Sequence, residues 1–217
     1  MPTFSLVHLE FLARAAQWTI GLSAIAFLGG GIMGFFVALA RVSDIRLLRT
    51  VASAYIQTVQ GTPLLVLLFL IYFGIAILGF NEVPAILAAA IGLTIYSSGF
   101  LAEIWRGCIQ SVPTTQWEAA ECLALTRWQR MTKVILPQAT RIATPPTVGF
   151  LVQIVKNTSL ASVVGFIELS QAGKLINNSI FEPFTIFIVV ALFYFAICFP
   201  ISVWSRTLER KLNVSRR

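Results

Sequence analysis

The feature that most constrains the fold of this chain is a series of long apolar runs. A helix that crosses a bilayer needs about 20 mainly apolar residues, because the hydrocarbon core is about 30 Å thick. Only 12% of the 217 residues are charged, whereas a soluble domain carries about 25%. The sequence therefore predicts a single all-α membrane domain, residues 1–217, with about five transmembrane helices. The candidate spans are residues 18–40, 58–80, 83–105, 146–169 and 183–205.

Two of these runs contain residues that disfavour a simple transmembrane helix. In the second run Gly61, Thr62 and Pro63 follow one another. Proline removes a backbone donor and clashes with the preceding turn, so we expect a break or a kink at this point. In the fourth run the stretch Lys156–Ser159 is polar, which makes it the least regular span by hydropathy.

The distribution of basic residues predicts the topology. When the first connection, the third connection and the C-terminal tail are placed on one side, thirteen of the sixteen Lys and Arg residues share that side. Connections rich in Lys and Arg stay in the cytoplasm. We therefore expect an external N-terminus and a cytoplasmic C-terminus, which agrees with an odd number of spans. The thirteen residues are Arg41, Arg46, Arg49, Arg106, Arg127, Arg130, Lys133, Arg141, Arg206, Arg210, Lys211, Arg216 and Arg217.

The third connection, residues 106–145, is long and carries two helix-start signals. Loops beyond about 12–15 residues are usually functional or have structure of their own. Thr115–Glu118 and Thr126–Gln129 both fit the capping box, in which a threonine caps the helix and an acid or amide reaches back to the cap. We therefore expect two short helices joined by a turn near Leu125. Pro137 should end the second helix, because the residue before a proline disfavours helical geometry.

Glu118 has two interpretations. In the first it is only the capping carboxylate of the first short helix. In the second it serves a partner, because this helix combines an apolar surface with the polar Glu118 and Glu121. Such a helix can pack on the membrane domain or protrude towards a soluble protein. The pattern of residues leaves both interpretations open.

Five blocks of this sequence resemble the permease subunits of ABC importers for polar amino acids. The block around Glu118-Ala119-Ala120, followed by a Leu-Pro pair after a fixed gap, resembles the EAA loop of these permeases. The other blocks occur in the same order as in the family and cover most of the chain. The five blocks are Gly61–Leu65, Ala102–Gly107, Trp117–Ala120, Ile135–Ala139 and Lys156–Ser162.

This resemblance implies a role and a set of partners. The EAA helix is the coupling helix of the family and sits in a groove of a cytoplasmic ATPase subunit. The residues implied in this coupling are Trp117, Glu118, Ala119, Ala120, Ala124 and Arg127. The expected partners are two ATPase subunits, a second permease subunit (identical or homologous), an external solute-binding protein, an amino-acid substrate and membrane lipid. ATP and Mg²⁺ would bind to the ATPase, so the chain is expected to be a non-enzymatic subunit without a cofactor of its own, in the bacterial cytoplasmic membrane.

The chain departs from the family pattern at three positions. Ala124 replaces the usual glycine after the EAA triplet, Val134 replaces the usual isoleucine, and Gln60 replaces the usual arginine before the Gly-Thr-Pro block. Alanine is a better helix former than glycine by about 1 kcal/mol. We therefore expect the first replacement to stiffen the turn.

A polar cluster in the fourth run is the candidate substrate path. If this span begins near Pro146, Asn157 lies about 16 Å deeper at 1.5 Å per residue, close to the middle of the bilayer. Polar groups at this depth usually face an interior path, although they also serve as hydrogen-bonding contacts between helices. Gln153 shares a helix face with Asn157, because the two are four residues apart. The full candidate set is Thr94, Ser97, Ser98, Gln153, Asn157, Thr158 and Ser159.

The residues of this path predict a class of substrate. Relatives that import basic amino acids typically have an acid at the position of Asn157 and a second one about two turns earlier, where this chain has Phe150. A carboxylate attracts a cationic side chain, whereas an amide accepts neutral or acidic ones. The sequence therefore favours a polar amino acid that is neutral or acidic rather than basic.

Other functional classes fit the sequence less well. The nearest match to an ATP-binding loop has Leu175 after Gly173-Lys174, where a hydroxyl residue is needed. His8 is the only histidine, so no metal site is expected. The basic residues form no patch interleaved with aromatic ones, which argues against nucleic-acid binding. An ion-coupled secondary transporter or a membrane scaffold remains the alternative. The former usually has repeated halves, and neither explains the helix pair.

Overall fold

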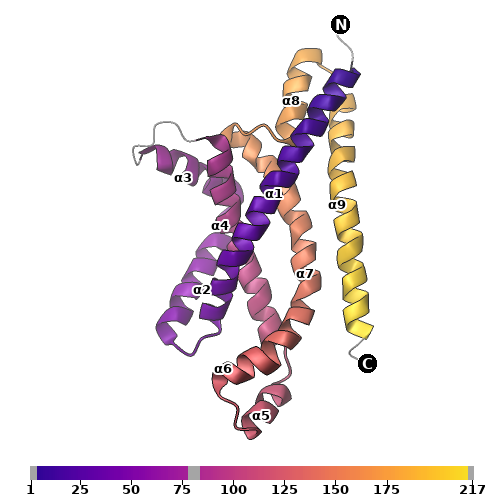
Figure 1. Cartoon of the computed structure of the whole chain (residues 1–217). Coiled ribbons are helices and arrows are strands. Elements are labelled where there is room, and N and C mark those ends of the chain that lie inside the picture. Colours follow the sequence, from indigo (N-terminus) through magenta and orange to yellow (C-terminus); the bar gives the residue numbers. More distant parts are fainter. Residues whose placement is uncertain (1–3, 78–83, 215–217) are drawn as a thin grey trace.

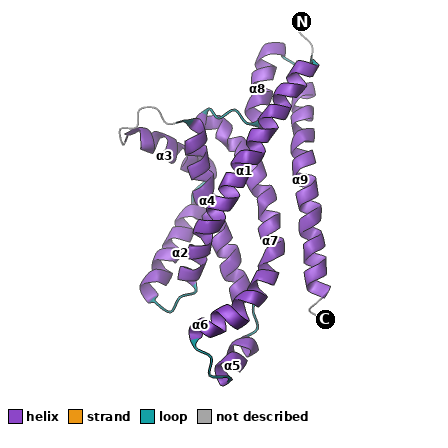
Figure 2. Cartoon of the chain, in the orientation of Figure 1, coloured by secondary structure: helices purple, strands orange, loops and turns teal. Residues whose placement is uncertain are grey.

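The computed structural model describes residues 4–77 and 84–214, and within these ranges it is helical and contains no strand. The prediction of an all-α protein is therefore confirmed. Figure 1 shows an elongated body with the two termini at opposite ends, and Figure 2 shows that short loops join the helices. The expected boundary between the second and third spans lies within residues 78–83, which are outside the described residues.

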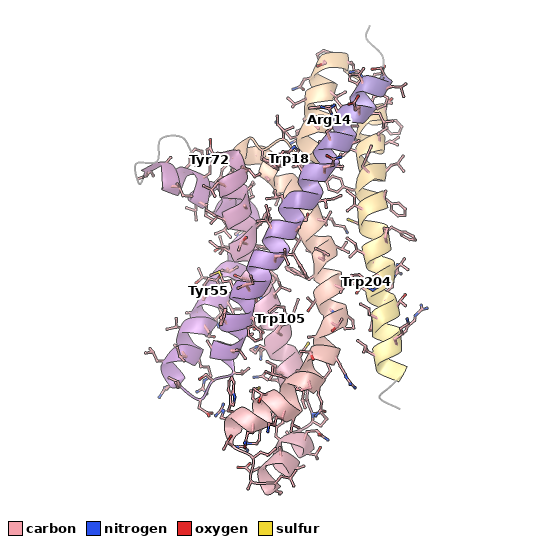
Figure 3. The ribbon with its side chains drawn as sticks, in the orientation of Figure 1. Arg14, Trp18, Tyr55, Tyr72, Trp105 and Trp204 are labelled. Atoms are coloured by element: carbon pink, nitrogen blue, oxygen red, sulfur yellow. The ribbon has the colours of Figure 1, made fainter. Side chains whose placement is uncertain are left out.

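Among the described residues, four helices are long and apolar enough to cross a membrane, and one bent pair could form a fifth span. This agrees with the expected number. The four are Leu6–Arg41, Ala85–Gln110, Arg127–Val164 and Pro183–Leu212. Among the labelled aromatic residues, Trp18 and Tyr72 lie nearer the N-terminal end of the molecule, and Tyr55, Trp105 and Trp204 lie further from it (Figure 3).

The centre of the fold is the packing of α1 (Leu6–Arg41) along α4 (Ala85–Gln110). Helix α1 begins before the expected span because residues 6–17 continue the helix beyond the apolar run. Two glycines permit the close approach. A Cβ atom at Gly30 would lie 2.5 Å from the Cβ of Ser97, and one at Gly34 would lie 2.9 Å from a backbone oxygen of α4. Any side chain at these two positions would push the helices apart.

The second apolar run is broken where the sequence predicted it. Helix α2 (Arg46–Gly61) and helix α3 (Leu64–Ile77) meet at an angle of 104°. Thr62 adopts an extended conformation with ψ 126°, as expected for the residue before a proline. The bend directs Leu68 of α3 onto α4 at Gly92. The prediction of a structural break at Gly61-Thr62-Pro63 is confirmed.

The third connection contains the two short helices α5 (Thr114–Cys122) and α6 (Arg127–Gln129). The second capping box is confirmed, because the Thr126 hydroxyl accepts from the amide of Gln129, whose side chain in turn accepts from the amide of Thr126. The prediction of the first capping box is wrong. Helix α5 already begins after Pro113, which takes the N-cap position, so Thr115 lies inside the first turn.

The expectation that Pro137 ends the second helix is also wrong. The chain continues from α6 through a π-helical segment, η1 (Arg130–Ile135), directly into α7 (Leu136–Asn157). Pro137 lies in the first turn of α7. Proline has no amide hydrogen to donate, and Pro137 lies just after the π-helical segment, where the backbone bonding changes to the α-helical pattern. The wider π turn accommodates the change of register between the two segments.

The fourth span also differs from the expected 146–169. Helix α7 begins ten residues earlier, with Pro145 and Pro146 in its interior, and it ends at Asn157. A 3₁₀ segment, η2 (Thr158–Val164), follows and ends at Gly165, whose φ of +85° is left-handed. Hydropathy does not reveal this change from an α-helix to a 3₁₀ helix, because it measures only how apolar the residues are.

Two further helices complete the fold, α8 (Leu169–Ile180) and α9 (Pro183–Val214). Helix α9 begins where the fifth span was expected and continues past its expected end at residue 205. Near the N-terminus α8 and α9 enclose an apolar cluster with the start of α1. The buried members of this cluster are Leu12, Ala15, Ala16, Leu169, Ala172, Ile176, Ile180, Ile186 and Val190.

Candidate functional site

The loop predicted to couple to an ATPase is seated on a small apolar core of its own. This core joins the ends of α1 and α4 to α5, η1 and α7, at the end of the molecule where Figure 1 shows α5 and α6. Its buried members are Ile109, Val112, Ile135 and Ala139, with Val42, Trp117, Met131, Val134, Leu136 and Ile142 packed around them. We call this set the loop core. The loop is thus fixed to the membrane helices by side chains from five segments.

The EAA block of α5 divides into an inner and an outer face. Trp117 is partly buried in the loop core and Ala120 is only 2% exposed. Glu118 and Ala119 are exposed on the opposite side. The capping interpretation of Glu118 fails, because the helix begins at Thr114 and no side chain caps it. The exposed Glu118 is therefore available to a partner, as its second interpretation requires.

Ala124 is the most strained position of the loop. Its φ of +53° is left-handed, a conformation that costs a non-glycine residue about 1–2 kcal/mol. The amide of Ala124 donates to the backbone carbonyl of Glu121 at 2.9 Å, and the amide of Leu125 donates to that of Ala120 at 3.3 Å. These two bonds form a Schellman motif, which usually has glycine at this position. The expectation that alanine stiffens the turn by favouring the helix is therefore wrong, because this residue lies outside the helix.

Arg127 points back towards the membrane helices. Its Nη2 donates to the backbone oxygen of Val42 at 3.2 Å, and its Nη1 forms an ion pair with Asp44. A second ion pair in the loop joins Arg130 to Glu121 at 3.0 Å. The arginine expected to couple to an ATPase thus contacts the connection between α1 and α2.

The second candidate site is the polar bend where α7 passes into η2. The Gln153 amide donates to Asn157 Oδ1 at 3.1 Å, so the two share a helix face as expected. Asn157 Nδ2 is buried without a hydrogen-bonding partner among the described residues. Buried polar atoms rarely lack a partner, and such an atom often marks a place that a ligand or water occupies. On the same side, the ring of Phe150 stacks on Phe100 with centroids 5.7 Å apart.

Thr158 and Ser159 follow Asn157 directly but turn their hydroxyls to the backbone. Thr158 donates to the carbonyl of Val155 at 2.8 Å, and Ser159 donates to that of Lys156 at 2.7 Å. Thr158 is fully buried, whereas Ser159 is partly exposed. These side-chain bonds add to the backbone bonds, whose geometry is poorer in a 3₁₀ helix.

The candidate residues of α4 face other helices than α7. A Cβ at Gly29 of α1 would lie 3.1 Å from Thr94, and Ser97 is buried against Gly30. The Ser98 hydroxyl lies 2.5 Å from that of Tyr55 on α2. The structure thus brings Gln153 and Asn157 together but places Thr94, Ser97 and Ser98 in the contacts of α4 with α1 and α2.

The sequence reasoning missed Glu168, a fully buried acid between η2 and α8. Its carboxylate accepts from the amides of Ser170 and Gln171 at 2.9 and 2.8 Å and from the Tyr194 hydroxyl at 2.7 Å. The following amide, that of Leu169, donates to Thr19 of α1 at 3.1 Å. A lone acid within an apolar run was the available signal, because such residues are costly and usually have a role.

The sequence over almost all of these helices matches one known protein family. A family described as "Binding-protein-dependent transport system inner membrane component" matches residues 17–214. The chain belongs to this family. Its members are permeases, that is, the membrane subunits of transporters whose ATPase is a separate subunit. The match includes the loop core, the polar bend and Glu168.

Three relatives show how similar other permeases are. The chain is 40% identical to the probable amino-acid ABC transporter permease protein YckA of Bacillus subtilis, over 93% of this chain and 88% of the relative. It is 36% identical to the probable glutamine permease GlnM of the same organism, over 91% of each chain. The glutamine permease GlnP of Escherichia coli is 32% identical, over 95% of this chain and 94% of the relative.

Solved structures agree with the fold. A crystal structure of an amino acid ABC transporter with histidines superposes with a TM-score of 0.89 at 34% identity, over 97% of this permease and all of that chain. The MetNI methionine ABC transporter in an inward-facing conformation superposes with a TM-score of 0.79 over 96% of this chain and 99% of that one, at 22% identity. The second likeness concerns the fold alone.

Proposed function

We propose that this permease imports a polar amino acid, neutral or acidic rather than basic, through a path lined at the polar bend by Gln153 and Asn157. The observation that carries the proposal is the buried Asn157 Nδ2, which has no partner in the described ranges 4–77 and 84–214 and lies next to the amide of Gln153. An amide nitrogen is a donor only. It therefore suits an acceptor such as a carboxylate or side-chain carbonyl oxygen of the substrate.

The names of the relatives support a polar substrate. Two of them are glutamine permeases, and a third, 35% identical, is an L-cystine transport system permease of Bacillus subtilis. Phe150 lies one turn from Gln153 on the same face and stacks on Phe100. Aromatic walls around one or two polar groups are typical of small-molecule sites. Thr158 and Ser159 would border this site, and Thr94, Ser97 and Ser98 would stiffen the helices behind it.

In this proposal, α5 is the element that couples the permease to ATP hydrolysis. In this proposal the α5–α6 end is cytoplasmic, the N-terminus is external, and the membrane is the bacterial cytoplasmic membrane. The outer face of α5, with Glu118 and Ala119, would contact the ATPase, while Trp117 and Ala120 would pass the movement to the loop core. The loop core is continuous with α7, which ends at the polar bend, so a displacement of α5 reaches Asn157 along a single helix.

The working transporter contains more than this chain. We propose two ATPase subunits that hold ATP and Mg²⁺, a second permease, identical or homologous, and an external solute-binding protein. Large apolar side chains of α9 are exposed in the single chain, which suits contact with lipid or with a second permease. They include Phe184, Ile188, Leu192, Phe195 and Trp204.

The assembled transporter in proteoliposomes tests this proposal. Uptake of labelled amino acids is measured with the binding protein in excess, and we expect neutral or acidic polar amino acids to be preferred. Asn157→Asp places a carboxylate at the bend and should shift the relative uptake towards arginine and lysine. Asn178→Asp, on the exposed face of α8, is the matched control. Preferred uptake of arginine by the unmodified transporter would refute the proposed substrate class.

A further inference from the structure

The connection between α1 and α2 forms a compact corner at the same end of the molecule as the coupling loop (Figure 1). We define the corner as residues 42–45. Its first residue, Val42, packs on the loop core, and the Ser43 hydroxyl accepts from the amide of Ile45 at 3.2 Å, just before α2 begins. The corner is therefore held both by the loop core and by a hydrogen bond within its own turn. In the sequence it joins α1 to α2, and in space it packs against the coupling loop.

Arg127 connects the coupling loop to this corner through two bonds of different kinds. One guanidinium nitrogen forms an ion pair with Asp44, and the other donates to the carbonyl of Val42 at 3.2 Å. The planar guanidinium holds its donors in a fixed fork, so two bonds fix its direction as well as its distance. The residue before it, Thr126, caps α6, which fixes the start of the helix that carries Arg127.

The pair is too exposed to be explained by folding stability. The Arg127 side chain is 44% exposed and that of Asp44 is 69% exposed. Exposed ion pairs contribute little to stability. The Val42 carbonyl, in contrast, is at the end of α1, so the bond from Arg127 also occupies a backbone acceptor that the helix leaves without a partner.

The corner leads to a different part of the fold from α7. Helix α2 begins at Arg46, is joined to α4 by the contact of Tyr55 with Ser98 at 2.5 Å, and ends at the 104° break before α3. A displacement of the corner therefore acts on the broken span. A displacement of the loop core acts on α7 and the polar bend. The route through the loop core to α7 and the route through the corner to α2 therefore diverge at Arg127.

We propose that Arg127 is a positioning residue that transmits the movement of the coupling loop to α2 and α3 through Asp44 and Val42, as a second route beside α7. This proposal rests on the proposed contact of α5 with the ATPase. It assigns Arg127 an inward role, towards the corner, in place of the contact with an ATPase that the sequence suggested. The α1–α2 corner then moves with the loop during each cycle.

A charge swap in the assembled transporter tests the proposal. Arg127→Asp and Asp44→Arg are made singly and together, and uptake per ATP hydrolysed is measured in proteoliposomes. Each single variant should lower this ratio by about 2- to 30-fold, the range expected for residues on a coupling route. The double variant should recover at least half of the loss. A purely structural role would lower the amount of assembled transporter and leave the ratio unchanged.

Two controls separate the possible failures. The exposed pair of Glu10 and Arg14, at 2.6 Å near the N-terminus, is swapped in the same way and should leave the ratio unchanged. Glu118→Ala tests the contact with the ATPase by co-purification. If Glu118→Ala keeps full association and coupling, the proposed function of α5 is wrong. If instead single variants at Arg127 and Asp44 keep the normal ratio, or the double variant does not recover, the second route is refuted. Loss of co-purification on Arg127→Asp alone would also refute it.

Discussion

Replacing Glu168 tests whether this buried carboxylate anchors the start of α8. Replacing it with alanine removes the acceptor of two amides at the start of α8 and of the Tyr194 hydroxyl. Loss of a helix cap costs about 0.5–2 kcal/mol. The Tyr194 hydroxyl keeps the Ser170 hydroxyl as a partner at 3.0 Å, so it loses one hydrogen bond, worth about 0.5–1.5 kcal/mol. We therefore expect Glu168→Ala to lower the free energy of unfolding by about 1–3.5 kcal/mol, the cap and hydrogen-bond contributions together.

The assay is thermal unfolding of the purified permease in detergent. For a chain of this length 1 kcal/mol corresponds to a shift of about 2–4 °C in Tm, so the expected decrease is roughly 2–14 °C. Hydrogen exchange should also accelerate in peptides that contain Ser170 and Gln171. Tyr194→Phe removes one donor and leaves the cap intact, so its effect should be about 0.5–1.5 kcal/mol without faster exchange at the start of α8.

Glu10→Ala is the control, because Glu10 is an exposed acid with an ordinary surface ion pair. Its expected effect is within about 0.5 kcal/mol. If Glu168→Ala unfolds at the same temperature as Glu10→Ala, the buried carboxylate does not anchor α8. The same conclusion would follow if exchange at the start of α8 did not change.

Two further substitutions test the backbone geometry. Ala124→Gly should raise the free energy of unfolding by about 0.5–1 kcal/mol, because glycine adopts the left-handed conformation without strain but loses more entropy on folding; an unchanged or lower Tm would contradict the Schellman assignment. Gly30→Ala should lower the free energy of unfolding by about 1–3 kcal/mol relative to Gly21→Ala, since the added Cβ overlaps Ser97, whereas the one at Gly21 meets nothing within 4 Å. Equal Tm values for the two alanine variants would refute the close contact of α1 with α4.

Local signals in the sequence predicted well the features that depend on local chemistry. The break at Pro63 follows from a missing amide and a clash within one turn, and the start of α6 at Thr126 follows from a reciprocal cap over four residues. The same logic failed at Thr115, where the pattern is equally good but Pro113 begins the helix earlier. It failed again at Pro137, because a π turn admits a proline that a regular helix would reject.

The candidate site was predicted in part, and the reason lies in the rotation of each helix. Successive residues of a helix are turned by about 100°, so a residue's position in the sequence gives its depth well but its facing direction poorly. Gln153 and Asn157 meet because they share one helix. Ser97 and Ser98 have a similar depth, but the rotation of α4 turns them towards α1 and α2.

The sequence by itself determined the membrane class, the approximate spans, the broken second span and the presence of short helices in the third connection. These features depend on hydropathy and on chemistry within a few residues. Only the tertiary structure decided which distant groups meet. Glu168 accepts from Tyr194 on another helix, and Arg127 reaches Asp44 at the corner of two others. Such contacts depend on how rigid helices pack, and packing is set by the shapes of the surfaces that meet.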